Sequence, residues 1–132
     1  MAGAEREIVS SGTSWSSRYT YAPALRVGDT VFLSGTTGTD DDGRIMAPGD
    51  IVEQTRQIFR KFERLLTAAG GSCADIVQTV DYITTTDNYK GTAAVRREFL
   101  KDARPASTGV IVAGLLREGA LIEISAVAIL KG

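Results

Sequence analysis

Histidine is absent from this 132-residue chain, and cysteine occurs once. Without histidine the chain cannot build a Ser-His-Asp or Cys-His nucleophile, and it lacks the most common zinc ligand. The lone Cys73 cannot form an internal disulfide, and it lies in the loop-like stretch GGSCADI with no imidazole to activate it. We therefore interpret Cys73 as a structural thiol. Any chemistry is expected to come from carboxylates, hydroxyls, backbone amides, lysine or arginine.

Long apolar runs and a strong charge imbalance are also missing. No segment approaches the roughly 20 apolar residues that cross a bilayer, and the N-terminus lacks the basic-then-apolar pattern of a secretory signal. The net charge of −1 and the pI near 5.4 provide no basic surface for nucleic acid or an anionic membrane. With 43% hydrophobic residues, the chain can bury one core but is too short for two domains. We expect one cytoplasmic domain over residues 1–132.

The apolar pattern predicts an α+β domain with the element order β-β-β-α-β-α-β-β. A turn at Val27-Gly28-Asp29 makes the second and third strands a hairpin, and Asp87 is a candidate N-cap for the second helix. Strands are predicted at residues 5–10, 19–27, 30–36, 75–85, 107–115 and 120–130, and helices at 51–69 and 88–101.

The first helix has the strongest pattern. Asp50 followed by Glu53 resembles a capping arrangement, and Gly70-Gly71 ends the helix. Apolar residues recur at helical spacing along its inner face. Its basic residues fall largely on the other face, which we expect to be solvated: Arg56, Arg60, Lys61 and Arg64.

The run Asp40-Asp41-Asp42-Gly43 could suggest a calcium loop. It lacks the later bidentate glutamate of such loops. We favour a solvated turn and expect no metal there.

The last predicted strand carries a lone carboxylate, Glu123, between apolar residues. Because side chains alternate along a strand, Ile122 and Ile124 point to one face and Glu123 to the other. The face with Glu123 is mostly apolar, and both helices are needed to cover the opposite face. An apolar face left in water predicts an interface, so we expect a homo-oligomer with Glu123 near a subunit boundary. Burial there would favour the protonated acid and suit it to acid–base chemistry.

Several segments resemble the RidA/YjgF family of enamine/imine deaminases. They are a tyrosine-bearing start (Tyr21), VGDTVFLSG, the helix–glycine–strand block over residues 54–84, and the ending RPAST–GVIVAGL–IEISAVAI. The resemblance covers nearly the whole chain, and the ending is its most specific part, because the family reads Pro-Ala-Arg-Ser/Thr, a strand, then Ile-Glu-Ile/Val. It implies a chorismate-mutase-like α+β protomer and a homotrimer with clefts between subunits.

The resemblance also implies a chemistry. Family members hydrolyse short-lived enamines and imines, released by pyridoxal-phosphate enzymes, to 2-keto acids and ammonia without a cofactor or metal. By this resemblance Glu123 is the catalytic carboxylate that positions water and moves protons. The substrate-binding positions carried over are Tyr21, Ser34, Gly35, Ser107, Thr108 and Gly109.

Ser107 departs from the family, since it stands where an arginine clamps the substrate carboxylate. Serine offers one neutral donor instead of a guanidinium fork, and removing one partner of a buried ion pair costs ~3–5 kcal/mol. Either the substrate lacks a carboxylate at this end, or another cation replaces the arginine, or the imine chemistry is lost. Arg96 is a candidate replacement for substrate binding, with an ordinary surface arginine as the alternative.

Three functions therefore stay open. The leading one is a divergent hydrolytic deaminase of an enamine, imine or related C–N substrate in a catabolic or specialised pathway, for example an aminomuconate-type compound. The second is a non-catalytic trimer that binds or senses a small ligand in the same clefts. The third is amide or carbamate hydrolysis with Glu123 as base. Each involves a small molecule and other copies of the chain, with no nucleic acid or membrane partner.

Overall fold

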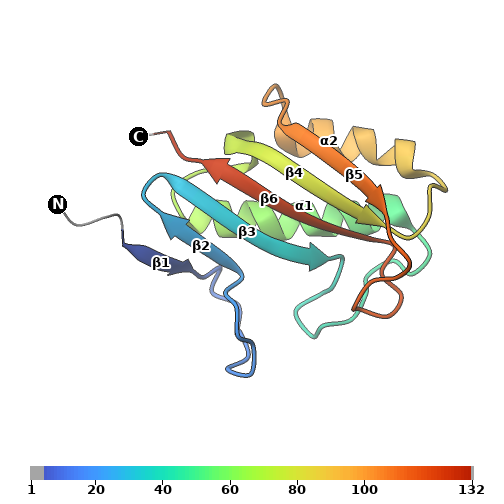
Figure 1. Cartoon of the computed structure of the whole chain (residues 1–132), viewed down its shortest axis with the longest axis horizontal. Helices are drawn as coiled ribbons and strands as arrows, with labels where there is room; N and C mark the ends of the chain where they lie inside the picture. Colours follow the sequence, from blue (N-terminus) through green and yellow to red (C-terminus); the bar gives the residue numbers. More distant parts are fainter. Residues whose placement is uncertain (1–4, 132) are drawn as a thin grey trace.

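Two helices pack on one face of a six-stranded sheet (Figure 1). The structure is a computed structural model that describes residues 5–131. The strands are β1 Arg6–Val9, β2 Ala24–Val27, β3 Thr30–Thr37, β4 Ile76–Ile83, β5 Ala106–Ile111 and β6 Ile122–Ile129. The helices are α1 Ile51–Ala68 and α2 Thr92–Leu100, each preceded or followed by a short 3-10 turn, η1 Cys73–Asp75 and η2 Tyr89–Gly91. The predicted α+β class and element order are confirmed.

The sheet has the order β1-β2-β3-β6-β4-β5. All neighbours are antiparallel except β4 and β5, which run parallel. The predicted hairpin joins β2 and β3, with Gly28 at φ 61° in the turn. The last two strands do not pair with each other, because β4 lies between β5 and β6.

Helix α1 forms where the sequence predicts it. The Asp50 carboxylate accepts hydrogen bonds from the backbone N–H groups of Val52 and Glu53, both at 3.1 Å. Its inner face contributes buried Ile58, Phe59 and Phe62 to the core. The expectation of a fully solvated basic face is wrong in part. Arg60 and Arg64 are exposed, whereas Arg56 is held by two glutamates and Lys61 is half-buried.

Three predicted boundaries are corrected. The fifth strand ends at Ile111 instead of residue 115, because its strand neighbour β4 ends at Ile83, opposite Ile111. The second strand begins at Ala24 instead of residue 19, because Tyr19 and Tyr21 belong to a loop in which they pack on Trp15. Helix α2 begins at Thr92 instead of residue 88, because Asn88 has a left-handed φ of 56° and a 3-10 turn follows. No side chain caps α2, so Asp87 does not serve as its N-cap.

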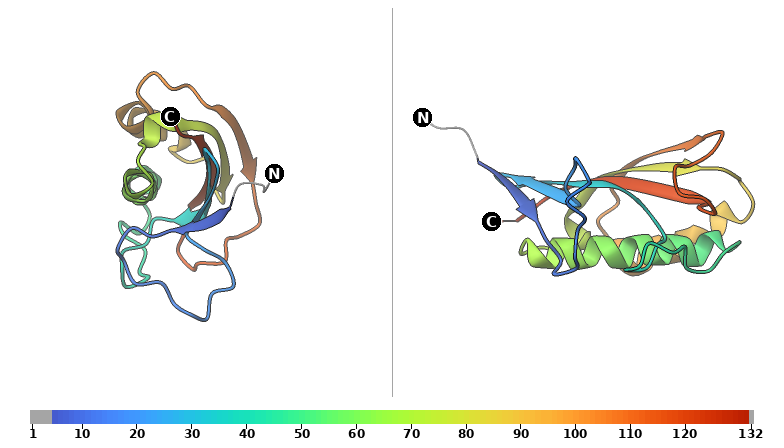
Figure 2. Two further views of the ribbon diagram at one scale, coloured as in Figure 1. Left: turned by 90° about the vertical axis from the view of Figure 1, so that its left-hand side faces the viewer. Right: turned by 90° about the horizontal axis from the view of Figure 1, so that it is seen from below.

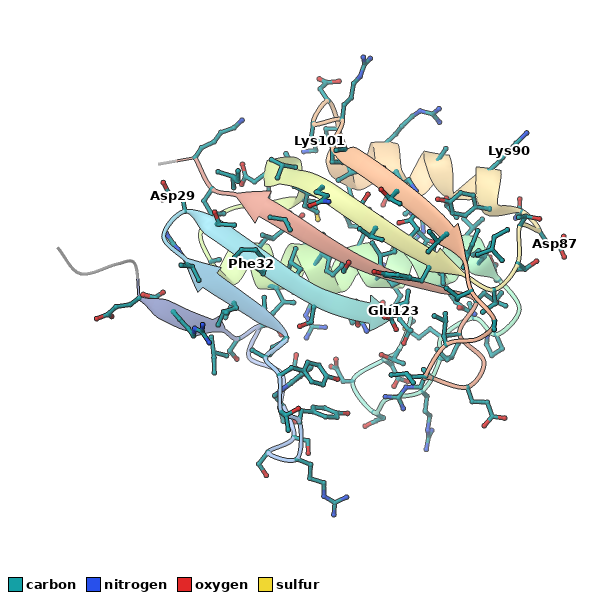
Figure 3. The ribbon with its side chains drawn as sticks, viewed as in Figure 1. Asp29, Phe32, Asp87, Lys90, Lys101 and Glu123 are labelled. Carbon is teal, nitrogen blue, oxygen red and sulfur yellow. The ribbon has the colours of Figure 1, made fainter. Side chains whose placement is uncertain are left out.

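The two faces of the sheet differ as the alternation in β6 predicts. Ile122, Ile124 and Ala128 are fully or almost fully buried beneath the helices, which lie together on one side of the curved sheet (Figure 2). The opposite face, here called the open face, carries Phe32 (Figure 3) and Ile129 at 47% and 49% exposure. An apolar strip is therefore left in contact with water in the isolated protomer.

No helix among residues 5–131 combines the length and apolarity needed to cross a lipid bilayer.

Candidate active site

Glu123 is the second residue of the central strand β6, so it lies at one end of the sheet, opposite Thr37, the last residue of β3, and Tyr82 of β4. Its half-buried side chain turns toward β3 and lies against Gly35. A Cβ added at Gly35 would be 2.8 Å from Glu123 Oε2. The β3–β6 register shifts on either side of Gly35, as in a β-bulge. The absence of a side chain at this bulge leaves the space that the carboxylate fills.

The carboxylate lines a cavity of about 960 Å³ at the rim of the sheet. Strand β2 pairs with β3 only as far as Leu33, so residues 34–37 of β3 have β6 as their only strand neighbour. The cavity lies along this free edge, and the 10–23 loop, the 39–43 loop and α1 form its other walls. Its size suits a small metabolite, and a carboxylate in its wall can accept or donate a proton there.

Four of the predicted site residues meet in this cavity: Tyr21, Ser34, Gly35 and Glu123. The Ser34 hydroxyl donates to the carbonyl of Ala22 at 2.6 Å, so it fixes the loop that carries Tyr21. Trp15 Nε1 donates to the carbonyl of Tyr21 at 2.8 Å. The aromatic rings of Trp15, Tyr19 and Tyr21 pack with centroids 4.8–5.4 Å apart. These three aromatic rings therefore form part of the wall of the cavity that Glu123 also lines.

Ser107, Thr108 and Gly109 lie outside this cavity within the protomer. They belong to the edge strand β5, whose six residues are all exposed. Strands β6 and β5 are separated by β4, so two strand spacings, roughly 10 Å, lie between these residues and Glu123. Within one chain these residues therefore do not line the cavity that contains Glu123.

Arg96 also lies outside the cavity. Its guanidinium forms an ion pair with Asp81, with Arg96 Nη2 2.6 Å from Asp81 Oδ2. Asp81 is fully buried on the helix face of β4 and also accepts a hydrogen bond from the Tyr89 hydroxyl. Burial, and then this hydrogen bond, raise the pKa of Tyr89 to about 12. The Arg96 guanidinium also lies 5.8 Å from the Phe59 ring centre, so the residue joins α2 to the core instead of lying on the surface.

Three further charged or polar residues line the cavity although the sequence did not single them out: Lys61, Thr39 and Arg117. The Lys61 ammonium donates to Thr39 Oγ1 at 2.8 Å. Burial, and then the nearby Arg117, lower the pKa of Lys61 to about 8. Helical periodicity could not reveal this, because a loop from β3 covers the helix at this point.

The two remaining candidate groups have structural surroundings. Cys73 is fully buried, and burial followed by the neighbouring Glu63 raises the pKa of its thiol, which agrees with a structural role. The Asp40 carboxylate accepts the backbone N–H groups of Asp42 and Arg44 at 2.9 and 3.0 Å. Asp40 therefore closes a turn, and the hydrogen bond from Arg44 lowers its pKa against the opposing effect of burial.

The fold and this rim cavity define an α+β protein of the YjgF type. A family model described as Endoribonuclease L-PSP matches residues 12–130. The chain belongs to this family, the YjgF/RidA family.

Individual relatives agree with this assignment. The 3-aminoacrylate deaminase RutC of Acinetobacter baylyi is 32% identical over 108 residues, which is 82% of this chain and 85% of that protein. Rv2704 of Mycobacterium tuberculosis, a member of the YjgF/YER057c/UK114 family, has a TM-score of 0.79 at 35% identity, covering 96% of this chain and all of that one. The Rid-family protein YyfA of Yersinia pestis has a TM-score of 0.85 at 26% identity, with the same coverage.

Proposed function

We propose that this protein is a hydrolytic deaminase of small enamines or imines, with Glu123 as its catalytic carboxylate. The observation that carries the proposal is the position of Glu123 Oε2 against Gly35 in the wall of the rim cavity. In its protonated form Glu123 can deliver a proton to substrate carbon, and the resulting carboxylate can then take a proton from water. The family membership and the deaminase relative support the same class of reaction.

The reaction balances with water alone. Protonation of the enamine at carbon gives an iminium ion, and water, deprotonated by Glu123, adds to the C=N carbon. The C–O bond forms, the nitrogen of the tetrahedral intermediate is protonated, and the C–N bond breaks to release ammonia. A carbonyl compound remains.

The active assembly is proposed to be a homotrimer. The apolar open face offers an interface, and the exposed residues of β5 require another chain if they are to reach a site at Glu123. In this arrangement Ser107, Thr108 and Gly109 of one protomer complete the cavity of its neighbour. A serine at position 107 holds a carboxylate weakly, so the proposed substrate differs from a simple 2-aminoacrylate.

The family description also names RNA cleavage. We favour the deaminase because a chain with net charge −1 and no histidine has few groups to bind or cleave a polyanion.

The test is ammonia release from imino acids with long side chains, which an amino-acid oxidase generates in situ, and from 3-aminoacrylate supplied separately. We expect 2-aminoacrylate to be a poor substrate. Glu123→Gln keeps the shape of the side chain and removes its acid–base function, so we expect a loss of roughly 10²–10⁴-fold in kcat. Glu118→Gln, a change at an exposed residue of the preceding turn, is the control. Turnover that survives Glu123→Gln, or RNA cleavage by the wild type that is lost with it, contradicts the proposal.

A further inference from the structure

An unpaired ammonium faces the rim cavity from the helix side. Lys61 projects from α1 and donates a hydrogen bond to Thr39 Oγ1. It is half-buried, and none of the ion pairs formed within residues 5–131 includes it. Burying an ammonium with only a neutral hydroxyl as partner is costly, so this position is unfavourable unless an anion joins it.

A second cation, the exposed Arg117, lines the same cavity. Arg117 is the charge with the largest effect on Lys61, ahead of Asp41, Arg64 and Asp40. Its Nη1 would lie 3.6 Å from a Cβ at Gly43, so the guanidinium contacts the tip of the 40–44 turn. Arg117 likewise takes part in no ion pair over the described part of the chain. Two like charges held together repel each other unless a negative group lies between them.

The nearby carboxylates already have other partners. Asp40 accepts two backbone N–H groups of its own turn. Asp41 Oδ1 lies 3.5 Å from Arg64 Nη1. The cavity lining as a whole holds three cations, Lys61, Arg64 and Arg117, and four carboxylates, Asp40, Asp41, Asp42 and Glu123. The feature that favours an anion is therefore the local pair Lys61 and Arg117, neither of which has an ion-pair partner among the described residues.

We propose that Lys61, Arg117 and the hydroxyl of Thr39 form a binding site for one carboxylate group of a small-molecule ligand. The ammonium and the guanidinium supply charge-assisted donors, and the Thr39 oxygen accepts from Lys61, which leaves its hydrogen free to donate. Gln57 Nε2 holds the Thr39 carbonyl at 2.9 Å and so fixes the position of Thr39. The carboxylates of the cavity lining repel a phosphate dianion more strongly than a singly charged carboxylate, so the site favours a carboxylate. The site stands on these contacts and does not depend on the deaminase reaction.

The experiment titrates the wild-type protein with butyrate, with its neutral analogue butyramide and with inorganic phosphate. Trp15, the only tryptophan, lines the same cavity, so its fluorescence and calorimetry report binding together. Butyrate should bind more tightly than the other two probes. Lys61→Met and Arg117→Met should each weaken butyrate binding about tenfold or more, while Lys61→Arg should retain it.

Arg60→Met is the matched control, because Arg60 precedes Lys61 on the same helix and is exposed. Since burial and Arg117 lower the pKa of Lys61 to about 8, butyrate binding should weaken as the pH rises from 7 to 9. The proposal is overturned if butyramide or phosphate binds as tightly as butyrate. It is also overturned if Lys61→Met leaves butyrate binding unchanged or if Arg60→Met weakens it equally. Ammonia-release assays do not enter these outcomes, so the deaminase proposal can fail separately.

Discussion

At the residue scale, the missing side chain of Gly35 determines where the Glu123 carboxylate can lie. The Gly35 backbone lies where a methyl group would press on Glu123 Oε2 at 2.8 Å. Gly35→Ala should therefore displace the carboxylate and reduce ammonia release about 10²-fold, since small misplacements of catalytic groups are costly. The melting temperature should change little, because Gly35 is exposed and has no positive φ.

Gly114→Ala is the control for this change, because nothing lies within 4 Å of the added Cβ. Equal activity of the Gly35 and Gly114 variants would show that Glu123 does not need its observed position.

Lys61 gives a prediction about pH. Its pKa is lowered from 10.5 to about 8, first by burial and then by Arg117. Below pH 8 both the folded and the unfolded chain bind this proton, and the folded state carries the full cost of the buried charge. Between pH 8 and 10.5 the unfolded state binds more protons, so folding becomes more favourable as the pH rises. The stability of the wild type relative to Lys61→Met should rise by about 1–3 kcal/mol across this window.

Urea unfolding of both proteins at pH 7 and pH 10 measures this difference. A constant difference would mean that Lys61 titrates normally in the folded protein.

The sequence identified the catalytic candidate but not its cationic neighbours. Alternation in the last strand and the family resemblance both led to Glu123, because these signals are local. Lys61 becomes half-buried only when the loop after β3 folds over α1, and that contact joins residues 22 positions apart. The apolar pattern of α1 therefore does not predict that Lys61 is half-buried.

At the scale of elements, the buried contact of Asp81 with Arg96 and Tyr89 connects β4 to α2. Asp81→Leu would leave the Arg96 guanidinium, only 18% exposed, without its carboxylate. We expect a loss of about 3–5 kcal/mol in the free energy of unfolding. The double change Asp81→Leu with Arg96→Met should recover part of this loss, because no unpaired charge remains.

Chemical denaturation of the single and double variants tests this link, with the exposed Asp102→Asn as control. A loss below about 1 kcal/mol for Asp81→Leu would place the contact among weak surface ion pairs.

The two helices show which element boundaries the sequence could predict. Helix α1 has a capping aspartate, a long apolar stripe and a terminal glycine, so its limits follow from local chemistry. Helix α2 has no capping side chain, and its start depends on the left-handed Asn88 and on packing against Asp81. Residues 19–23 have aromatic and β-branched side chains typical of a strand, but their rings pack together in a loop.

At the scale of the whole molecule, the apolar open face predicts that the protein forms a homotrimer. Phe32, Val110 and Ile129 are 38–49% exposed on the protomer surface. We expect wild-type protein to elute with three times the 14.0 kDa mass of one chain. Phe32→Asp should shift it to the monomer and abolish ammonia release, because a charge in an apolar interface is unfavourable.

Light scattering after size-exclusion chromatography measures the mass, and Arg60→Asp on the far side of α1 is the control. A monomeric wild type, or a trimer that persists in the Phe32→Asp variant, would contradict the proposal that the open face is the subunit interface.

Strand β6 lies in the centre of the sheet yet is the last of the six strands to be synthesised. While it is still missing, β3 and β4 have no common neighbour, and the apolar faces of both helices have no complete floor to pack on. A nascent chain that has not yet reached β6 therefore exposes the apolar surface that β6 later covers. We expect such a chain to aggregate easily until β6 has paired with β3 and β4.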